Sequence, residues 1–256
     1  MNLDEIVKRL FESGIENARF EAEQMMRSLP PEQLSEALRH RCAGYPLQYL
    51  LGEWDFYHES YEVSEDCLIP RADTELLVER AVELLPPDAR FLDLCTGSGC
   101  IAISTLCARP DTSAVAVELY EKTLALAKRN AKRNGAAERV ELLRADVLQS
   151  PPRGIGDGFH AILSNPPYIR ADVMPTLQRE VQHEPAAALC GGEDGLDFYR
   201  AILTHWAPLL APDGFLLFEI GYDQRKALAA LAEKHGFSHT VWRDLGGNDR
   251  VVRLQK

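Results

Sequence analysis

The chain has 256 residues, 46% of them hydrophobic and 26% charged, which is the composition of a folded globular protein. This length allows one or two domains with a substantial buried core. Acidic residues outnumber basic residues by 39 to 28, and the net charge of −11 favours basic or cationic partners over bulk nucleic acid. No apolar run reaches the roughly 18 residues that a membrane span needs, so we expect no membrane association.

The six cysteines show no Cys-x-x-Cys spacing, and no secretory signal precedes them. This pattern predicts neither a zinc site nor a disulfide framework, and reduced thiols in a cytoplasm fit it best. His235 and His239 are four residues apart, as in helical zinc sites, but Gly236 lies between them and a strand is expected to follow. We therefore predict no metal site.

Apolar residues recur at helical spacing in the first fifty residues, and the Pro30-Pro31 pair separates two such segments. The pattern predicts a small bundle of amphipathic helices, with Pro31 in a first helical turn. The aromatic and β-branched run at residues 54–63 predicts a hairpin, and a new helix is expected near Asp73. We therefore divide the chain into a helical domain (residues 1–52), a linker with a β-hairpin (53–72) and a larger domain (73–256).

Short apolar runs alternate with helix-length segments from Arg90 onward. This βαβ alternation predicts a doubly wound α/β fold, with a mostly parallel, seven-stranded sheet covered on both faces. The expected strands are residues 91–95, 114–118, 140–143, 161–164, 215–220, 239–242 and 251–254. Only a short segment separates the last two strands, so they are expected to pair antiparallel.

A glycine-containing loop follows the first of these strands, at the edge where open α/β sheets bind ligands. Glycine allows a tight turn and close approach of a ligand to the backbone, so we predict a nucleotide-like cofactor here. Glu118 ends the next strand, where an acid can accept both ribose hydroxyls of NAD or of S-adenosylmethionine. Asp146 follows the third strand and can reach an adenine amino group. The candidate residues of the loop itself are Asp93, Cys95, Thr96, Gly97, Ser98 and Gly99.

Each of these residues also has a structural interpretation. The glycines can serve helix packing alone, Glu118 can be a solvated acid at a strand end, and Asp146 can cap the next segment.

The sequence Asn165-Pro166-Pro167-Tyr168 directly follows the fourth expected strand. Proline keeps its predecessor extended and donates no backbone hydrogen bond, so the chain leaves the strand as a stiff loop. The Asn165 side-chain oxygen and the Pro166 carbonyl are acceptors beside the ring of Tyr168, which suits a planar NH₂ group. The structural alternative is a proline-stiffened strand end with Tyr168 in the core. Together with the glycine loop on a neighbouring strand, however, this motif indicates S-adenosylmethionine-dependent methylation of an amino group on a planar, conjugated centre.

With these motifs the chain resembles the peptide-chain release factor glutamine methyltransferases, also called protein-(glutamine-N5) methyltransferases. The resemblance spans nearly the whole chain. It also includes residues 44–52, 68–75, 184–185, 191–197, 219–221 and 249–251. Three positions depart from the family pattern: Tyr45 replaces a usually polar residue, Ala72 replaces a usual proline, and Val147 stands where an aromatic sometimes covers the adenine.

The resemblance implies a Rossmann-like methyltransferase sheet and S-adenosyl-L-methionine as cofactor. The implied substrate is the glutamine of the Gly-Gly-Gln loop in class 1 peptide-chain release factors, methylated at its side-chain nitrogen and docked by the helical domain. Carried over to this chain, Asn165, Pro166 and Tyr168 are catalytic, and Pro167 joins them in binding substrate. Besides the loop residues, the cofactor contacts are Glu118, Asp146, Val147 and Asn165. We expect a cytoplasmic monomer that binds no nucleic acid directly.

Three alternatives stay open. DNA adenine and RNA guanine methyltransferases share the Asn-Pro-Pro-Tyr motif, but they need a basic groove and a pocket for a flipped base, whereas this chain is acidic. An NAD-linked oxidoreductase fits Gly97, Gly99 and Ala102 but leaves residues 165–168 unused. A catalytically idle adaptor would bind the cofactor without transferring a methyl group. The basic helix after Glu118 is interpreted as a solvated face rather than an RNA contact.

Overall fold

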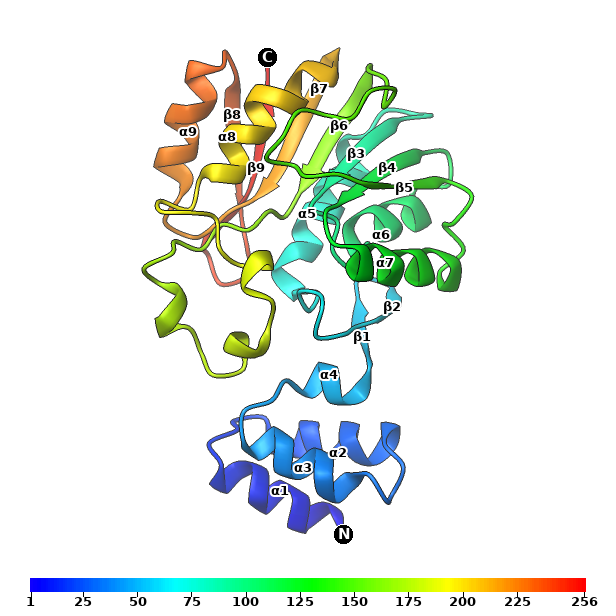
Figure 1. The fold of residues 1–256 in the computed structure, drawn as a ribbon, viewed down its shortest axis with the longest axis vertical. Coiled ribbons are helices and arrows are strands. Elements are labelled where there is room, and N and C mark those ends of the chain that lie inside the picture. Colours follow the sequence, from blue (N-terminus) through cyan, green and yellow to red (C-terminus); the bar gives the residue numbers. More distant parts are fainter.

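Four short helices at the amino end pack around their own apolar cluster. The structure, a computed structural model, describes residues 1–256. The helices form the lower end of the molecule in Figure 1 and are α1 (Leu3–Glu12), α2 (Ala18–Ser28), α3 (Leu34–Cys42) and α4 (Leu47–Leu51). Because Ile6, Leu10, Met25 and Leu38 are fully buried among them, this segment is the helical bundle that the sequence predicts.

The predicted place of Pro31 is wrong, because it lies in a turn before α3 rather than in a first helical turn. The Gln33 amide closes this turn with a 2.9 Å hydrogen bond to the Pro30 carbonyl. The first bond between residues four apart runs from the Ala37 amide to the Gln33 carbonyl, so α3 begins only at Leu34.

A β-hairpin joins the helices to the larger unit. Its strands β1 (Glu53–Phe56) and β2 (Glu59–Glu62) pair antiparallel, as expected, and α5 (Ala72–Leu84) follows. Tyr61 of β2 is fully buried, and its hydroxyl shares a 2.6 Å hydrogen bond with the Ser104 hydroxyl of the larger unit. The hairpin is therefore anchored to that unit.

The larger unit is built on a seven-stranded sheet of order β5-β4-β3-β6-β7-β9-β8. Its strands are β3 (Arg90–Leu94), β4 (Ser113–Glu118), β5 (Val140–Arg144), β6 (Phe159–Ser164), β7 (Leu210–Glu219), β8 (Ser238–Arg243) and β9 (Asp249–Gln255). The strands from β5 to β7 are parallel, and β9 pairs antiparallel with both β7 and β8. The predicted strands and the antiparallel final pair are confirmed, although β7 begins earlier, at Leu210 opposite Phe159.

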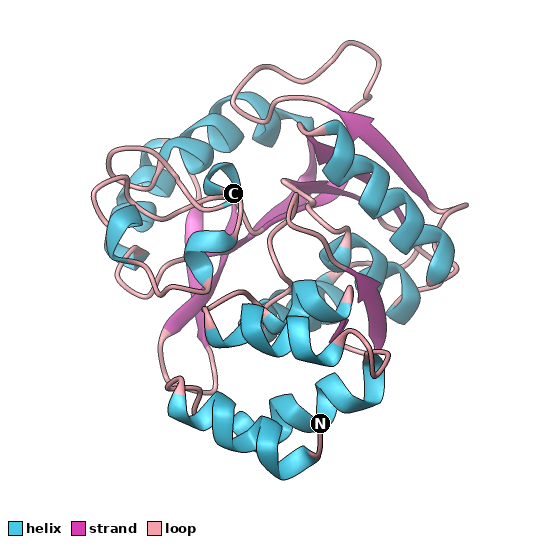
Figure 2. Cartoon of the chain, turned by 60° about the horizontal axis from the view of Figure 1, so that its bottom comes forward, coloured by secondary structure: helices cyan, strands magenta, loops and turns pink.

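Helices cover both faces of the sheet, as Figures 1 and 2 show. One face carries α5, α6 (Cys100–Ala108) and α7 (Glu121–Arg133), and the other carries α8 (Asp197–Ala201) and α9 (Arg225–Lys234). Along β3, Phe91 packs under the first group, whereas Leu92 and Leu94 pack under the second. This period of two is typical of a strand buried on both sides. None of the helices combines the length and apolar character required to cross a membrane.

The strand order reverses between β3 and β6. β3 is followed by β4 and β5 on one side of this point, and β6 is followed by β7 on the other. Leu94 and Ser164, the last residues of the two strands, are partners in register. Since ligands bind at such switch points, the loops after β3 and β6 are placed to form one site.

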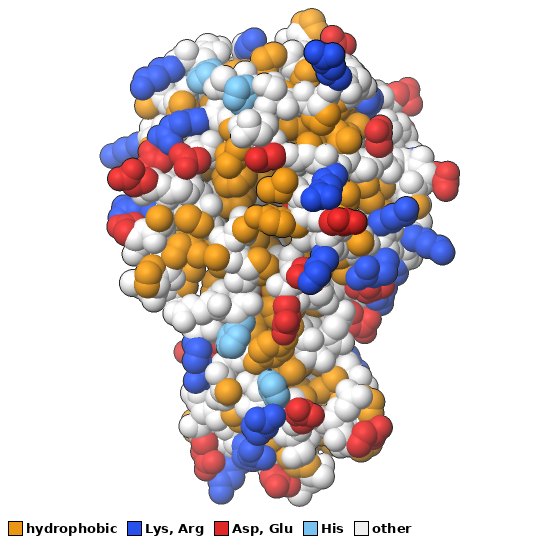
Figure 3. Space-filling view, viewed as in Figure 1, with side chains coloured by type: hydrophobic (Ala, Val, Ile, Leu, Met, Phe, Trp, Pro, Cys, Tyr) orange, Lys and Arg blue, Asp and Glu red, His pale blue; other side chains and the backbone are white.

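The long β6–α8 loop, residues 165–196, reaches from the sheet edge toward the helical unit in Figure 1. Arg41 of α3 donates a 3.1 Å hydrogen bond to Glu180 of this loop, and the rings of Tyr45 and His183 meet edge to face at 5.4 Å. Figure 3 shows the narrow waist between the two units. The loop therefore crosses the waist and contacts both units.

The basic residues of α7 contact acids of the hairpin and linker. The pairs are Arg129–Glu62 at 2.6 Å, Arg133–Glu53 at 2.8 Å and Lys122–Asp66 at 3.2 Å. These contacts support the structural interpretation of the basic helix face.

Candidate active site

A cavity of about 400 Å³ opens at the carboxyl ends of β3, β4 and β6. This volume falls in the range of roughly 300–1,000 Å³ that is typical of small-molecule sites. The predicted site residues on its wall are Cys95, Thr96, Gly97, Ser98, Glu118, Asp146, Val147, Asn165 and Pro167. Four other predicted residues, Asp93, Gly99, Pro166 and Tyr168, do not line it.

The loop after β3 bends sharply. Cys95, Gly97 and Gly99 have φ angles of 60°, 58° and 85°, in the left-handed region. Glycine adopts this conformation without strain, whereas Cys95 is strained by its β-carbon. The Thr96 amide donates a 3.0 Å hydrogen bond to the Val117 carbonyl of β4, which closes the loop across the neighbouring strand. The backbone is thereby held against the cavity.

Asp93 supports this loop from inside the protein. Its Oδ2 atom accepts hydrogen bonds from the Thr96 hydroxyl at 2.5 Å and the Ala102 amide at 3.2 Å. The side chain is fully buried, and its Oδ1 atom has no partner. Burial raises the pKa of Asp93 to about 7. Asp93 therefore shapes the loop from behind rather than lining the cavity.

Glu118 ties three backbone amides together at the end of β4. Its Oε2 atom accepts from Gly97 at 3.1 Å, and its Oε1 atom accepts from Leu119 at 2.8 Å and Tyr120 at 3.0 Å. Burial raises the pKa of Glu118, while these hydrogen bonds lower it. A carboxylate offers about four lone pairs, so Oε2 has room for about one further hydroxyl donor rather than two.

Asp146 and Val147 form the wall beyond β5. The Asp146 Oδ1 atom accepts a 2.9 Å hydrogen bond from the Leu148 amide, so the predicted capping contact exists alongside its place on the wall. The Val147 carbonyl accepts a 3.0 Å hydrogen bond from the indole of the fully buried Trp206. These contacts fix this part of the wall to the core.

Asn165 reaches the cavity from the end of β6. Its Nδ2 atom donates a 3.1 Å hydrogen bond to the hydroxyl of Thr74 at the start of α5. The Asn165 Oδ1 atom has no partner in the chain and is not among the buried atoms, and the Pro166 carbonyl also accepts no hydrogen bond. Two acceptors after β6 therefore have no partner in the chain, although Pro166 does not line the cavity.

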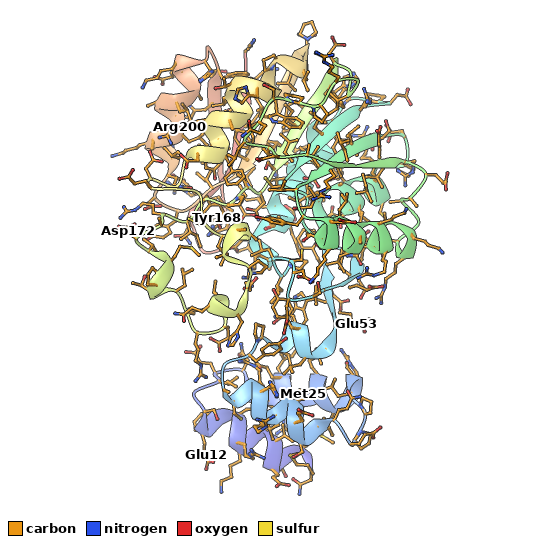
Figure 4. The ribbon with its side chains drawn as sticks, in the orientation of Figure 1. Glu12, Met25, Glu53, Tyr168, Asp172 and Arg200 are labelled. Atoms are coloured by element: carbon orange, nitrogen blue, oxygen red, sulfur yellow. The ribbon has the colours of Figure 1, made fainter.

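Tyr168 is held away from the cavity wall. Its half-buried ring packs against the apolar cluster under α8 and α9, and its hydroxyl donates a 3.2 Å hydrogen bond to Glu219 Oε1 at the end of β7. Figure 4 labels Tyr168, which lies in the first part of the β6–α8 loop. Pro166 is also buried. The Tyr168 placement matches the structural alternative considered for this motif.

The charge on the cavity wall is mainly negative. Its acidic residues are Asp66, Glu118, Asp146 and Asp197, and Arg71 is its one basic residue. The Arg71 guanidinium contacts the buried Glu184 carboxylate, which also accepts a 3.0 Å hydrogen bond from the Ile69 amide. Since this positive charge is already paired, the cavity favours a cationic ligand.

Residue-level reasoning missed much of the wall. The linker residues Cys67, Leu68, Ile69 and Pro70 line the cavity, as do Thr74, Pro185, Cys190, Gly192 and Phe198. Several of them belong to the segments 68–75, 184–185 and 191–197 on which the family resemblance rests. Those segments were the available signal. From them the resemblance implies a place in the cofactor pocket for Arg71, Asp73 and Glu75, of which Arg71 lines the cavity.

Comparisons with known proteins decide the family. The methyltransferase small domain family matches residues 72–192. The release factor glutamine methyltransferase of Moorella thermoacetica is 39% identical and aligns over 97% of this chain and 95% of its own length. This chain belongs to the release factor glutamine methyltransferase family.

Other members of the release factor glutamine methyltransferase family are similarly close. The one from Cereibacter sphaeroides is 43% identical over 88% of this chain and 80% of its own length. Among solved structures, a methyltransferase from Pyrococcus furiosus has a TM-score of 0.58 at 20% identity, covering 77% of this chain and 88% of that one. This likeness concerns the fold alone, and it confirms the Rossmann-like methyltransferase sheet. The protein is a methyltransferase by family.

Proposed function

We propose that this protein methylates the side-chain nitrogen (N5) of the glutamine in the Gly-Gly-Gln loop of class 1 peptide-chain release factors, using S-adenosyl-L-methionine. The observation that carries this proposal is the Asn165 carboxamide, whose oxygen stays free beside the glycine loop while its nitrogen is held by Thr74. The names of the relatives supply the substrate class. The proposal includes a monomeric, cytoplasmic enzyme whose residues 1–52 dock the substrate.

The residues of the cavity fit S-adenosylmethionine. The Glu118 Oε2 atom retains room for a ribose hydroxyl, and Asp146 has a carboxylate oxygen left for an adenine amino group. The acidic wall suits a sulfonium cation. When bound, this cofactor supplies a methyl group activated by a positively charged sulfur.

The free acceptors after β6 suit a primary amide. An amide nitrogen is a poor nucleophile because its lone pair is delocalised into the carbonyl. When Asn165 Oδ1 and the Pro166 carbonyl each accept one of its N–H groups, they orient the nitrogen and stabilise the positive charge that develops on it. A nitrogen that carries this charge becomes acidic and loses its proton to water, so no strong base is required. Orientation of this kind contributes roughly 7–11 kcal/mol to lowering a barrier.

Transfer of label from S-adenosylmethionine to a purified release factor tests the proposal. We expect label on the wild-type release factor and none on a variant whose loop glutamine is replaced by alanine. Label on both would place the modified residue elsewhere. Label on DNA or RNA, and not on the release factor, would favour a nucleic-acid amino methyltransferase.

The variant Asn165→Ala tests the acceptor role of the carboxamide. We expect kcat to fall by roughly 100-fold or more, because one of two orienting acceptors is lost. The affinity for S-adenosylmethionine, measured by calorimetry, should stay close to wild type because Glu118 and the β3 loop are untouched. An Asn165→Ala enzyme with wild-type kcat would contradict this mechanism.

A further inference from the structure

Thr74 lies beside the Asn165 carboxamide on the cavity wall, and Glu219 lies behind Thr74. Both side chains are buried, each residue being 2% exposed. The Thr74 hydroxyl accepts a 3.1 Å hydrogen bond from Asn165 Nδ2 and donates one of 2.5 Å to Glu219 Oε2. The three side chains therefore form a continuous chain of hydrogen bonds from the sheet core to the cavity.

The direction of these hydrogen bonds is set by Glu219. A carboxylate can only accept, and each oxygen of this one takes a hydroxyl proton, from Thr74 on Oε2 and from Tyr168 on Oε1. Because the single proton of the Thr74 hydroxyl points to Glu219, that hydroxyl can only accept from Asn165. Asn165 must then turn its NH₂ group toward Thr74 and its oxygen toward the cavity.

Two neighbours of Glu219 oppose the effect of its burial. Burial raises the pKa of Glu219, whereas the Thr74 hydroxyl and the Arg250 guanidinium lower it. Arg250 lies in β9 with a side chain 12% exposed, and it also contacts Asp73 at 3.2 Å. A buried cation thus opposes the cost of the buried carboxylate.

We propose that Thr74 and Glu219 are positioning residues that hold the Asn165 carboxamide with Oδ1 toward the substrate amide. If the carboxamide rotated by half a turn, its NH₂ group would face the NH₂ group of the substrate, and two donors cannot form a hydrogen bond. The hydrogen-bond chain excludes this unproductive orientation. The inference rests on the proposed function, because it takes the acceptor role of Asn165 from there.

The substitutions Thr74→Val and Thr74→Ser separate the hydroxyl from the volume of the side chain. Valine keeps the shape but removes the hydroxyl, so we expect kcat to fall roughly tenfold or more, while the Kd for S-adenosylmethionine changes less than about twofold. Serine restores the hydroxyl and should bring kcat to within about threefold of wild type. In an Asn165→Ala background, Thr74→Val should have no further effect on kcat, since it acts through Asn165.

Thr105→Val is the matched control. Thr105 in α6 is also fully buried, but its hydroxyl has no partner, so its removal should leave kcat unchanged. If Thr74→Val does not fold, Glu219→Gln decides instead. Its neutral amide can point either its oxygen or its NH₂ group at Thr74, and we expect kcat to fall several-fold at unchanged cofactor Kd.

The result that would overturn the inference is wild-type kcat in Thr74→Val, or in Glu219→Gln where the valine variant does not fold. An equal loss in Thr74→Val and Thr74→Ser, or a parallel loss of cofactor affinity, would also overturn it by showing a structural role. Wild-type enzyme that transfers no label to the release factor would instead refute the proposed function. The two failures are therefore distinguishable.

Discussion

Gly191 lies against the backbone of the Asn165–Tyr168 motif, so Gly191→Ala should disturb the acceptors without removing any functional group. The β-carbon of an alanine would lie 2.6 Å from the Pro167 carbonyl oxygen and 2.7 Å from the Tyr168 Cα, whereas ordinary contact begins at 3.4 Å. Both neighbours are backbone atoms, so the loop must move by on the order of 0.8 Å, and a misplacement of about 1 Å costs roughly 100-fold in rate. We expect kcat to fall about 10- to 100-fold, with a loss of about 1–3 kcal/mol in the free energy of unfolding.

Label transfer to the release factor measures kcat, and urea denaturation measures stability. Gly246→Ala is the matched control, because Gly246 is exposed in the turn between β8 and β9 and its added β-carbon would meet only side-chain atoms, at 3.2 Å. We expect this control to behave as wild type. A folded Gly191→Ala enzyme with wild-type kcat would refute the link between loop position and turnover, and so would an equal loss in the control.

Three further variants probe other parts of the structure. Gly97→Val places a β-branched residue at a φ of 58°, and we expect calorimetry to show at least about tenfold weaker binding of S-adenosylmethionine. Unchanged affinity would show that the cofactor does not bind at this loop. Arg41→Met removes the partner that lies 2.6 Å from the carboxylate of Glu21, whose side chain is 13% exposed. We expect thermal denaturation to show a loss of about 3 kcal/mol in stability. An unchanged Tm would show that the pair contributes nothing. In Asp93→Asn the pH dependence of stability should change. The pKa of Asp93 is about 7 in the folded protein and lies above its ordinary value of 3.8, so the stability that this group contributes declines as the pH rises between these values. Urea denaturation should therefore show that Asp93→Asn is more stable relative to wild type at pH 8 than at pH 5. The same stability difference between variant and wild type at both pH values would contradict the raised pKa.

The sheet could be predicted because its signal is local. Each strand is a short apolar run bounded by turn residues, and burial on both faces makes that run conspicuous in the sequence. The loop that carries Asn165 and Pro166 directly after β6 could be predicted for the same reason, because proline restricts the chain within the motif itself.

The contacts behind the motif could not be predicted in this way. Thr74 and Asn165 are 91 residues apart in the chain, and Thr74 and Glu219 are 145 residues apart. No local pattern encodes such a pairing, because it arises only when α5, β6 and β7 pack together. The position of Tyr168 depends on the same packing. Its hydroxyl donates a hydrogen bond to Glu219, and its ring packs against the core rather than on the cavity wall.

The β6–α8 loop connects the helical bundle to the cavity. The stretch that contacts the helical bundle through Glu180 continues directly into Pro185 and Cys190, which border the cavity. Residues 180–190 therefore join a contact with the bundle to the edge of the cavity. Removing the amino-terminal helices would therefore also remove the Arg41 contact from the segment that borders the cavity.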